Sequence, residues 1–482
     1  MLFSDRSLSD AGRPPVVGSH RAALDSLDTR HGVQRSKDPG ARRRRILLLL
    51  FIAVAHPVGA QRPDLSGTWD LTDRVSQLTF ERARAQTGTP TACDSNEAQI
   101  RLLRLLTPLP QRFTLTQRDS AIFITGDGGA SNTFHPDERD EKLSLGGLEI
   151  GYRARWTTGG ALVIELKPQF GGTIVETYTP GSQSLLEVVQ TIEHPVLSQP
   201  ARQRVTYSRG EPQVQAAGGQ SAGQVADTTF RPVIERPAYQ PRSGPVVFVD
   251  EAHANFHTAS GRYLPFADLL RRDGYVVRSS ADRLTSEVLR VARALVIANA
   301  RDAFTPAEVE AVRVWVAGGG SLLLITDHPP FVEAATELAR AFGIRLRNAG
   351  AADPEIGSGR LFFRRSDGTL KDHPITRGID EVTTFTGSSF QIDSAGQPLL
   401  VFGPQVCSYA GAFDLHPLPL EGHLQGAVLQ FGLGRVAVFG EAAMFSAQVT
   451  GPNRSPMGMN APVARQNVQF LLNVMHWLTG SL

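Results

Sequence analysis

The chain has 482 residues, enough for two or three domains, and its composition is that of a soluble globular protein. Lysine and arginine number 49 against 47 acidic residues, which leaves a net charge of +2. This balance indicates neither a nucleic-acid partner nor a strongly acidic one. Only Cys93 and Cys407 are present, far apart in the sequence, so a disulfide framework is excluded. We expect two unpaired thiols rather than a bridge between domains.

An export signal is predicted within residues 1–60. Four arginines at 42–45 precede an apolar run at 46–55, and Val58 and Ala60 are small residues placed for cleavage. The run is about half of the roughly 20 residues that span a bilayer, which favours a cleaved signal peptide over a membrane anchor. We expect cleavage near Ala60, no transmembrane helix in the mature chain, and a periplasmic or secreted location. The polar residues 1–40 are expected to be disordered, with a true start near Val33.

Residues 61–210 are predicted to form a mostly antiparallel β domain, a barrel or a sandwich. A charged helical stretch at 74–106 interrupts it. The Ser-Gly-Thr-Trp opening at 66–69 and the later strand rhythm resemble exported lipocalin-like domains. The following segment, 211–243, is rich in Gln, Ala, Gly and Pro and is typical of an extended linker. The expected strands of the β domain are 65–71, 113–117, 121–125, 152–156, 161–166, 173–178, 185–192 and 204–208.

Residues 244–482 change to alternating strands and helices, which predicts an α/β domain with a parallel sheet and helices on both faces. The clearest helix start is at Thr305, where Pro306 and Glu308 complete a capping box. The expected helices are 263–272, 286–292, 305–317, 331–342 and 465–478. The expected strands are 246–249, 275–278, 294–298, 322–325, 361–363, 399–402, 427–430 and 436–439.

Five segments of this domain carry a family resemblance: 246–250, 319–325, 372–379, 434–441 and 467–478. They resemble the class I glutamine amidotransferase-like superfamily, and segment 372–379 also resembles its trehalose-utilisation-type and uncharacterised bacterial members. The resemblance implies a flavodoxin-like fold.

The resemblance fails at the nucleophile. Glutamine amidotransferases carry a Cys on a sharp turn after the fourth strand. Here that strand is followed by Thr326, Asp327 and His328, and Cys407 lies far away in sequence. Because a thiolate is needed to attack the glutamine amide, we do not expect glutamine amidotransferase activity.

Polar residues follow the first strand of the predicted sheet, where open α/β sheets bind ligands. Asp250 is a candidate ligand-binding group or general base, or alternatively a carboxylate that satisfies helix N–H groups. Glu251 and Asn255 are further ligand-binding candidates. His253 and His257 have the spacing of a zinc-binding pair on a helix, yet their surroundings look like a loop. Lining a polar pocket, lying on the surface and lying within the core remain open for both.

Two more strands end in candidate site residues. Asp327 and His328 follow strand 322–325 and are the candidate catalytic residues. Glu441 follows strand 436–439 and is a ligand-binding candidate, with helix capping as the alternative. Converging with Asp250 and His253, they would suit a metal site or general acid–base chemistry. A buried polar network that holds strand ends together is the alternative. The candidate metal ligands are Asp250, His253, His257 and Asp327, and neither the metal nor a cofactor is determined.

Two functions therefore remain open. The first is an exported binding or accessory protein that holds a small polar ligand or a protein partner in a crevice at the strand ends. The second is a hydrolase, with or without a metal, that uses the same Asp, His and Glu residues. No phosphate loop, dinucleotide motif or nucleophile elbow supports the enzyme, so binding is favoured.

Overall fold

The structure is a computed structural model, and it describes residues 62–482 apart from 77, 82–92, 119, 127–130, 146–147, 183, 212–222, 355, 357–358, 394, 412–413 and 452–453. The predicted signal peptide and N-terminal extension, residues 1–60, lie outside the described residues. Among the helices that are described, none has both the length and the apolar character to cross a membrane.

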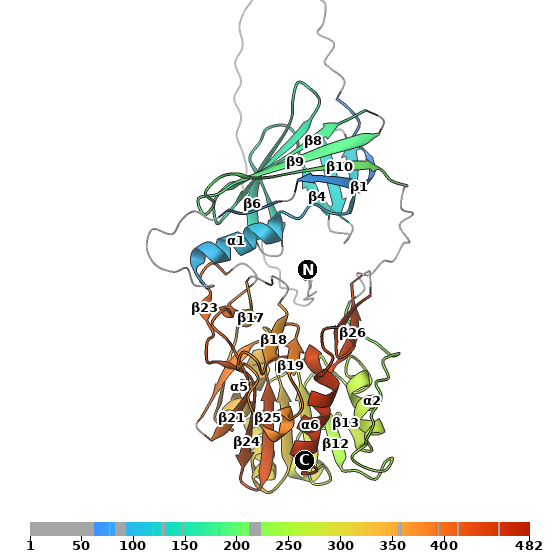
Figure 1. Ribbon diagram of the computed structural model, residues 1–482, viewed down its shortest axis with the longest axis vertical. Helices are drawn as coiled ribbons and strands as arrows, with labels where there is room; N and C mark the ends of the chain where they lie inside the picture. Colours follow the sequence, from blue (N-terminus) through green and yellow to red (C-terminus); the bar gives the residue numbers. More distant parts are fainter. Residues whose placement is uncertain are drawn as a thin grey trace, which may run out of the picture. The chain divides into compact units, whose positions relative to one another are not determined.

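The N-terminal region is a ten-stranded antiparallel sheet that curls into a barrel-like form (Figure 1). Strand β1 pairs with both β2 and β10, so the first and last strands of this region are neighbours. Within the described residues, β4 and β5 are the two strands at the edges of the sheet. Helix α1 (Ser95–Leu106) lies between β1 and β2 in the chain. The strands are β1 (Gly67–Ser76), β2 (Arg112–Arg118), β3 (Ala121–Gly126), β4 (Ser131–Phe134), β5 (Glu141–Leu145), β6 (Leu148–Trp156), β7 (Leu162–Pro168), β8 (Thr173–Pro180), β9 (Leu185–Glu193) and β10 (Ala201–Arg209).

This sheet has one apolar face that forms a core, as its alternating sequence predicts. Phe113 and Tyr207 meet edge to face, with ring centroids 4.9 Å apart, and Trp69 donates its indole N–H to the Leu65 carbonyl at 3.0 Å. The predicted antiparallel barrel or sandwich is therefore confirmed at the level of an antiparallel, barrel-like sheet.

The C-terminal region is a nine-stranded mixed sheet with helices on both faces. Eight of its strands lie in the order β13-β12-β14-β15-β25-β24-β20-β16, and β21 pairs with β24. The strands of this sheet are β12 (Val246–Asp250), β13 (Val276–Ser280), β14 (Ala294–Ala298), β15 (Ser321–Ile325), β16 (Ile344–Arg347), β20 (Ser389–Ile392), β21 (Gly396–Val401), β24 (Leu424–Phe431) and β25 (Gly434–Phe439). The helices are α2 (Leu264–Arg272), α3 (Ser286–Leu289), α4 (Pro306–Ala317), α5 (Phe331–Arg340) and α6 (Asn467–Thr479).

Alternate residues of the central strands divide between two cores. In β14, Val296 packs in the core that includes α2 and α6, while Leu295 and Ile297 pack in the core that includes α3, α4 and α5. This two-sided burial explains the continuous apolar runs of the parallel strands. The capping box at Thr305 and Glu308 is confirmed.

The expected parallel sheet is only partly correct. The pairs β12–β13, β12–β14, β14–β15 and β15–β25 are parallel, whereas β25–β24, β24–β20, β24–β21 and β20–β16 are antiparallel. The hairpin β24–β25 causes the change, because a short turn can join only antiparallel strands.

Short elements surround the sheet. Strand β11 (Val225–Ala226) pairs with β26, and Phe230, Ile234 and Tyr239 pack against the α/β core, so this part of the predicted linker is attached to the domain. The remaining elements are β17 (Gly350–Ala352), β18 (Leu361–Arg364), β19 (Glu381–Thr384), β22 (Cys407–Tyr409), β23 (Leu418–Pro419), β26 (Ala447–Thr450), β27 (Ser455–Gly458), η1 (Pro374–Thr376) and η2 (Ala443–Phe445).

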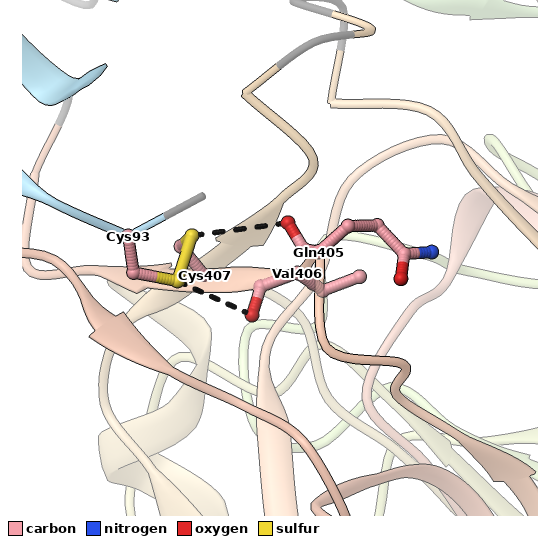
Figure 2. Close-up of a disulfide and its surroundings, with 4 residues drawn as sticks. All are labelled: Cys93, Gln405, Val406 and Cys407. Atoms are coloured by element: carbon pink, nitrogen blue, oxygen red, sulfur yellow. Dashed lines mark hydrogen bonds between the residues drawn. A yellow bond between two sulfur atoms is a disulfide. The ribbon is translucent and has the colours of Figure 1, made fainter. Parts of the chain in front are cut away.

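The two cysteines form a disulfide, so the expectation of unpaired thiols is wrong. Cys93 precedes α1 and Cys407 begins β22, with Cα atoms 5.6 Å apart and a sequence separation of 314 (Figure 2). The sulfurs lie 3.7 Å and 3.8 Å from the carbonyl oxygens of Val406 and Gln405. An oxidised sulfur carries no hydrogen, so these approaches are packing contacts and not hydrogen bonds.

Candidate functional site

Polar residues follow four neighbouring strands at the carboxyl edge of the parallel part of the sheet. Asp250 ends β12, Asn299 follows β14, Thr326 follows β15 and Glu441 follows β25. Backbone hydrogen bonds between neighbouring strands continue one residue past the strand ends. The Asn299 N–H donates to the Ile325 carbonyl, and the Thr326 N–H donates to the Phe439 carbonyl. These residues are therefore held side by side, as parallel strands require.

The first of two polar clusters at this edge is centred on His253. Its Nδ1 lies 2.9 Å from an Asp250 oxygen and its Nε2 lies 3.2 Å from a Glu308 oxygen. All three side chains are buried. Glu308 also accepts from the Thr305 and Leu284 N–H groups and from Arg283. We call Asp250, His253 and Glu308 the His253 network.

Charge holds this network together. Burial alone would lower the pKa of His253, but the hydrogen bond and charge of Asp250, with the charge of Glu308, raise it above its ordinary value. Burial would raise the pKa of Glu308, but its bonds to Thr305 and Leu284 and the His253 charge lower it to about 2. The network ties the end of β12 to the start of α4. The alternative interpretation of Asp250 and His253, a buried polar network, therefore fits their contacts.

Glu251 and Asn255 also make internal contacts. A Glu251 oxygen accepts from the Ala259 N–H at 2.9 Å and from the Ser279 hydroxyl at 2.8 Å. The Asn255 side-chain oxygen accepts from the His253 N–H at 3.1 Å. These bonds shape the loop between β12 and α2.

The second cluster joins Asp327 and Glu441. Asp327 accepts from the Thr386 hydroxyl at 3.2 Å and from the Ala442 N–H at 3.3 Å. Glu441 is fully buried and accepts from the N–H groups that begin the η2 turn. Burial and the Asp327 charge raise the pKa of Glu441 well above its ordinary value, against the effect of those N–H groups. The two carboxyls therefore interact, and the unfavourable proximity falls on Glu441.

Tyr263 lies beside this carboxyl pair. Its hydroxyl donates to the Ala442 carbonyl at 2.8 Å. Burial and the charges of Glu441 and Asp327 raise its pKa well above the ordinary value. Tyr263 therefore remains a neutral hydrogen-bond donor.

Buried polar atoms without a protein partner gather near the second cluster. The side-chain oxygens of Asn299, Thr326 and Ser388 have no hydrogen-bond partner among the described residues, although each residue is at most 1% exposed. The Ser388 N–H donates to the Gly440 carbonyl at 2.7 Å, which places Ser388 next to Glu441. A buried polar atom is costly unless something binds it. We call Asn299, Thr326, Asp327, Ser388 and Glu441 the strand-edge site.

His257 and His253 lie in different surroundings. The His253 ring packs on Phe304 with centroids 4.0 Å apart, whereas the His257 ring packs on Tyr263 at 4.5 Å. Burial, aided by the Arg262 charge, lowers the pKa of His257 to about 3. Within the part of the chain that the structure describes, no three His, Cys, Asp or Glu side chains are arranged to hold a metal ion.

His328 is partly accessible, with a side chain that is 41% exposed. Its Nδ1 lies 2.7 Å from the Pro329 carbonyl, and its Nε2 lies 3.9 Å from Asp327 Oδ1. The ring therefore lies beside Asp327 without a direct hydrogen bond to it.

Replacing His257 with glutamine is expected to reduce the loss of stability in acid. Because the folded-state pKa is about 3 and the ordinary value is 6.5, the unfolded chain binds more protons between these values. The stability that neutral His257 contributes is present above pH 6.5 and is lost as the pH falls towards 3. Urea unfolding at about pH 7.5 and about pH 4.5 measures this, and the stability difference between the two conditions should be smaller for His257→Gln than for the wild type. Equal differences would contradict it.

Sequence reasoning missed several of these residues. Asn299 and Thr326 directly follow apolar strands, so the strand-end rule that selected Asp250 could have selected them too. Glu308 was recognised only as part of a capping box. Its contact with His253 joins residues distant in sequence, and no local pattern predicts that contact.

The comparisons with known proteins cover only parts of the chain. Residues 255–447 match the model of a domain of unknown function, DUF4350. No curated protein matches the sequence. Among solved structures, the mmIFT52 N-terminal domain is 18% identical, covering 48% of this chain and 97% of its own, with a TM-score of 0.38. A putative ThuA-like protein from Parabacteroides merdae is 10% identical, and the match covers 49% of this chain and 90% of that protein, with a TM-score of 0.31. A point mutant of the fluorescent protein UnaG is 12% identical, and the match covers 31% of this chain and 97% of that protein, with a TM-score of 0.20.

Proposed function

We propose that this is an exported two-domain protein whose α/β domain binds a small polar ligand at the strand-edge site. The main support is that the buried side-chain oxygens of Asn299, Thr326 and Ser388 have no hydrogen-bond partner among the described residues. A ligand with several O–H or N–H groups, such as a carbohydrate, would satisfy these oxygens and the Asp327 carboxylate together.

The disulfide supports the export part of the proposal. Bridges such as Cys93–Cys407 form and persist in oxidising compartments and are rare in the cytosol. The signal peptide predicted at 42–60 would deliver the chain to such a compartment.

The proposal keeps the class I glutamine amidotransferase-like, flavodoxin-like assignment for the α/β domain and the lipocalin-like assignment for the β domain. The parallel strands, numbered along the chain, lie in the order 2-1-3-4-5, which supports a flavodoxin-like arrangement. Both cysteines of the sequence are joined in the disulfide, so neither offers a thiolate to attack an amide.

Asp327→Asn should weaken ligand binding without unfolding the protein. Removing its charge relieves the repulsion with Glu441, so the melting temperature should stay the same or rise. The test is thermal melting of the full chain with a panel of sugars and polyols, in which a ligand stabilises the wild type and not Asp327→Asn. Asp282→Asn, which removes an exposed carboxylate of the same domain, is the matched control and should respond like the wild type.

Two outcomes would count against the site. If no member of the panel raises the melting temperature of the wild type, the ligand class is wrong. If Asp327→Asn is strongly destabilised, Asp327 is a structural hydrogen-bonding group and the binding proposal fails with it.

The alternative is a hydrolase that uses the carboxyl pair, favoured by one observation. Burial and the Asp327 charge raise the pKa of Glu441 well above its ordinary value, and a raised pKa suits a carboxyl for the role of general acid. Glu441 would hold the proton and Asp327 would accept one. The test is hydrolysis of nitrophenyl esters and glycosides, with any activity lost in Glu441→Gln and kept in Asp282→Asn. Activity that survives Glu441→Gln would exclude this role.

A further inference from the structure

A pocket of about 390 Å³ opens at the other end of the sheet, where β14 and β15 begin. This is within the size range of small-molecule sites. It lies at the opposite ends of these strands from the strand-edge site. Its lining includes Ser286, Arg290, Arg293, Val314, Trp315 and the glycines at 318–320.

The carbonyl groups that end α4 are all satisfied beside this pocket. Those of Val314, Trp315 and Val316 accept from the N–H groups of the three glycines at 318–320, and the Ala317 carbonyl accepts from the Leu433 N–H at 2.9 Å. Bare carbonyls at a helix C-terminus would repel an anion. Here their hydrogen bonds weaken that repulsion.

The two arginines of the pocket differ in their contacts. Arg293 donates a hydrogen bond to the Gly319 carbonyl, in the turn that follows α4. The Arg290 side chain is exposed and has no hydrogen bond or ion pair with any other described residue. By contrast Arg313, on α4, is paired with Glu310 at 2.8 Å. Arg290 therefore supplies an uncompensated positive charge to the pocket.

Apolar groups surround this charge. The Trp315 ring forms part of the lining, and Val314 is 52% exposed. Leu433, 78% exposed, lies next to the pocket, because a Cβ on Gly319 would be 3.9 Å from the Leu433 Cβ. These exposed aliphatic side chains give the pocket an apolar margin on which an apolar group could pack.

We propose that this pocket binds a small organic carboxylate that carries a branched aliphatic or aromatic group. The carboxylate pairs with the Arg290 guanidinium, whose planar donors match its two oxygens. The apolar group packs on Trp315 and Val314. This site is independent of the function proposed for the strand-edge site.

The test is tryptophan fluorescence of the full chain titrated with 4-methylpentanoate and, separately, with its uncharged amide. The acid should change the fluorescence saturably, and the amide should bind at least about tenfold more weakly because it cannot form the ion pair. Arg290→Gln should weaken binding of the acid by a similar factor. Arg313→Gln removes the same charge from α4 outside the pocket lining and should bind the acid like the wild type.

Trp315→Phe identifies the source of the signal, because the saturable change should disappear in this variant. The proposal is overturned if the wild type shows no saturable change, if the acid and the amide bind equally, or if Arg290→Gln binds the acid as the wild type does.

Discussion

Replacing His253 with alanine is expected to lower the free energy of unfolding by about 3–5 kcal/mol, the usual cost of breaking a buried ion pair by removing one partner. His253 lies between Asp250 and Glu308, and all three side chains are buried. Without the imidazole, the two carboxylates lose their shared hydrogen-bond donor. Chemical denaturation of the two proteins at about pH 6, below the ordinary pKa of histidine, measures the difference.

His328→Ala is the matched control for this variant. It also removes a histidine that follows a strand at the same edge, but its ring is 41% exposed. Its effect should stay within about 0.5 kcal/mol. If His253→Ala proves as mild as His328→Ala, the network is not a structural element and its residues become available again as ligand-binding candidates.

The pH dependence of His253→Gln gives the same network a second signature. Because the folded-state pKa of His253 is raised, its contribution is full below the ordinary value of 6.5 and is lost as the pH rises through the folded-state pKa. Glu308, with its pKa lowered from 4.5 to about 2, contributes fully above pH 4.5 and loses that contribution as the pH falls towards 2. The stability difference between wild type and His253→Gln should therefore be largest between about pH 4.5 and 6.5. A difference that grows above about pH 7 would contradict the raised pKa.

The central strands of the α/β sheet could be predicted because their burial produces continuous apolar runs in the sequence. Strand β14 and residues 322–325 of β15 are apolar throughout, since helices cover both faces. Strands β16 and β20 could not be predicted in this way. They are short, carry polar residues, and owe their strand conformation to pairing with each other and with β24. Strand 427–430 was predicted, but its hairpin with 436–439 was not recognised, so the sheet was expected to be parallel.

The candidate site was predictable to the same degree. Parallel strands bring their carboxyl ends to one edge, which correctly placed Asp250, Asp327 and Glu441 there. That rule does not predict which side chains at this edge contact one another. Asp250 forms its contacts with His253, while Asp327 and Glu441 form a separate pair. Partners that come from distant segments, such as Glu308 and Ser388, leave no pattern in the sequence around the strand ends.

The disulfide illustrates the same limit most clearly. Cys93 and Cys407 are 314 residues apart, and nothing in the residues around either one indicates its partner. Only the folded structure shows that the segment before α1 reaches β22. Near this bridge, the Arg101 guanidinium lies 4.1 Å from the centre of the Tyr409 ring and Ser95 contacts His416 at 3.3 Å.

Removing the disulfide is expected to lower the stability of the protein by about 2–5 kcal/mol. A bridge that closes so long a loop restricts the unfolded chain strongly, which places the expected effect in the upper part of that range. The double variant Cys93→Ala, Cys407→Ala is preferred over either single variant, because it leaves no free thiol to form bridges between molecules. Thermal and urea unfolding against the oxidised wild type measure the loss.

Binding at the strand-edge site should survive this loss of stability. Cys407 lies in β22 and contributes no atom to the strand-edge site, so a ligand of that site should bind the folded double variant with unchanged affinity. Because reduction of the wild type breaks the same bond, wild type unfolded in the presence of dithiothreitol should match the double variant. If the reduced wild type remains as stable as the oxidised form, the bridge adds nothing to the fold. If the double variant is stable but no longer binds, the bridge acts on the site itself and Cys407 is not dispensable for function.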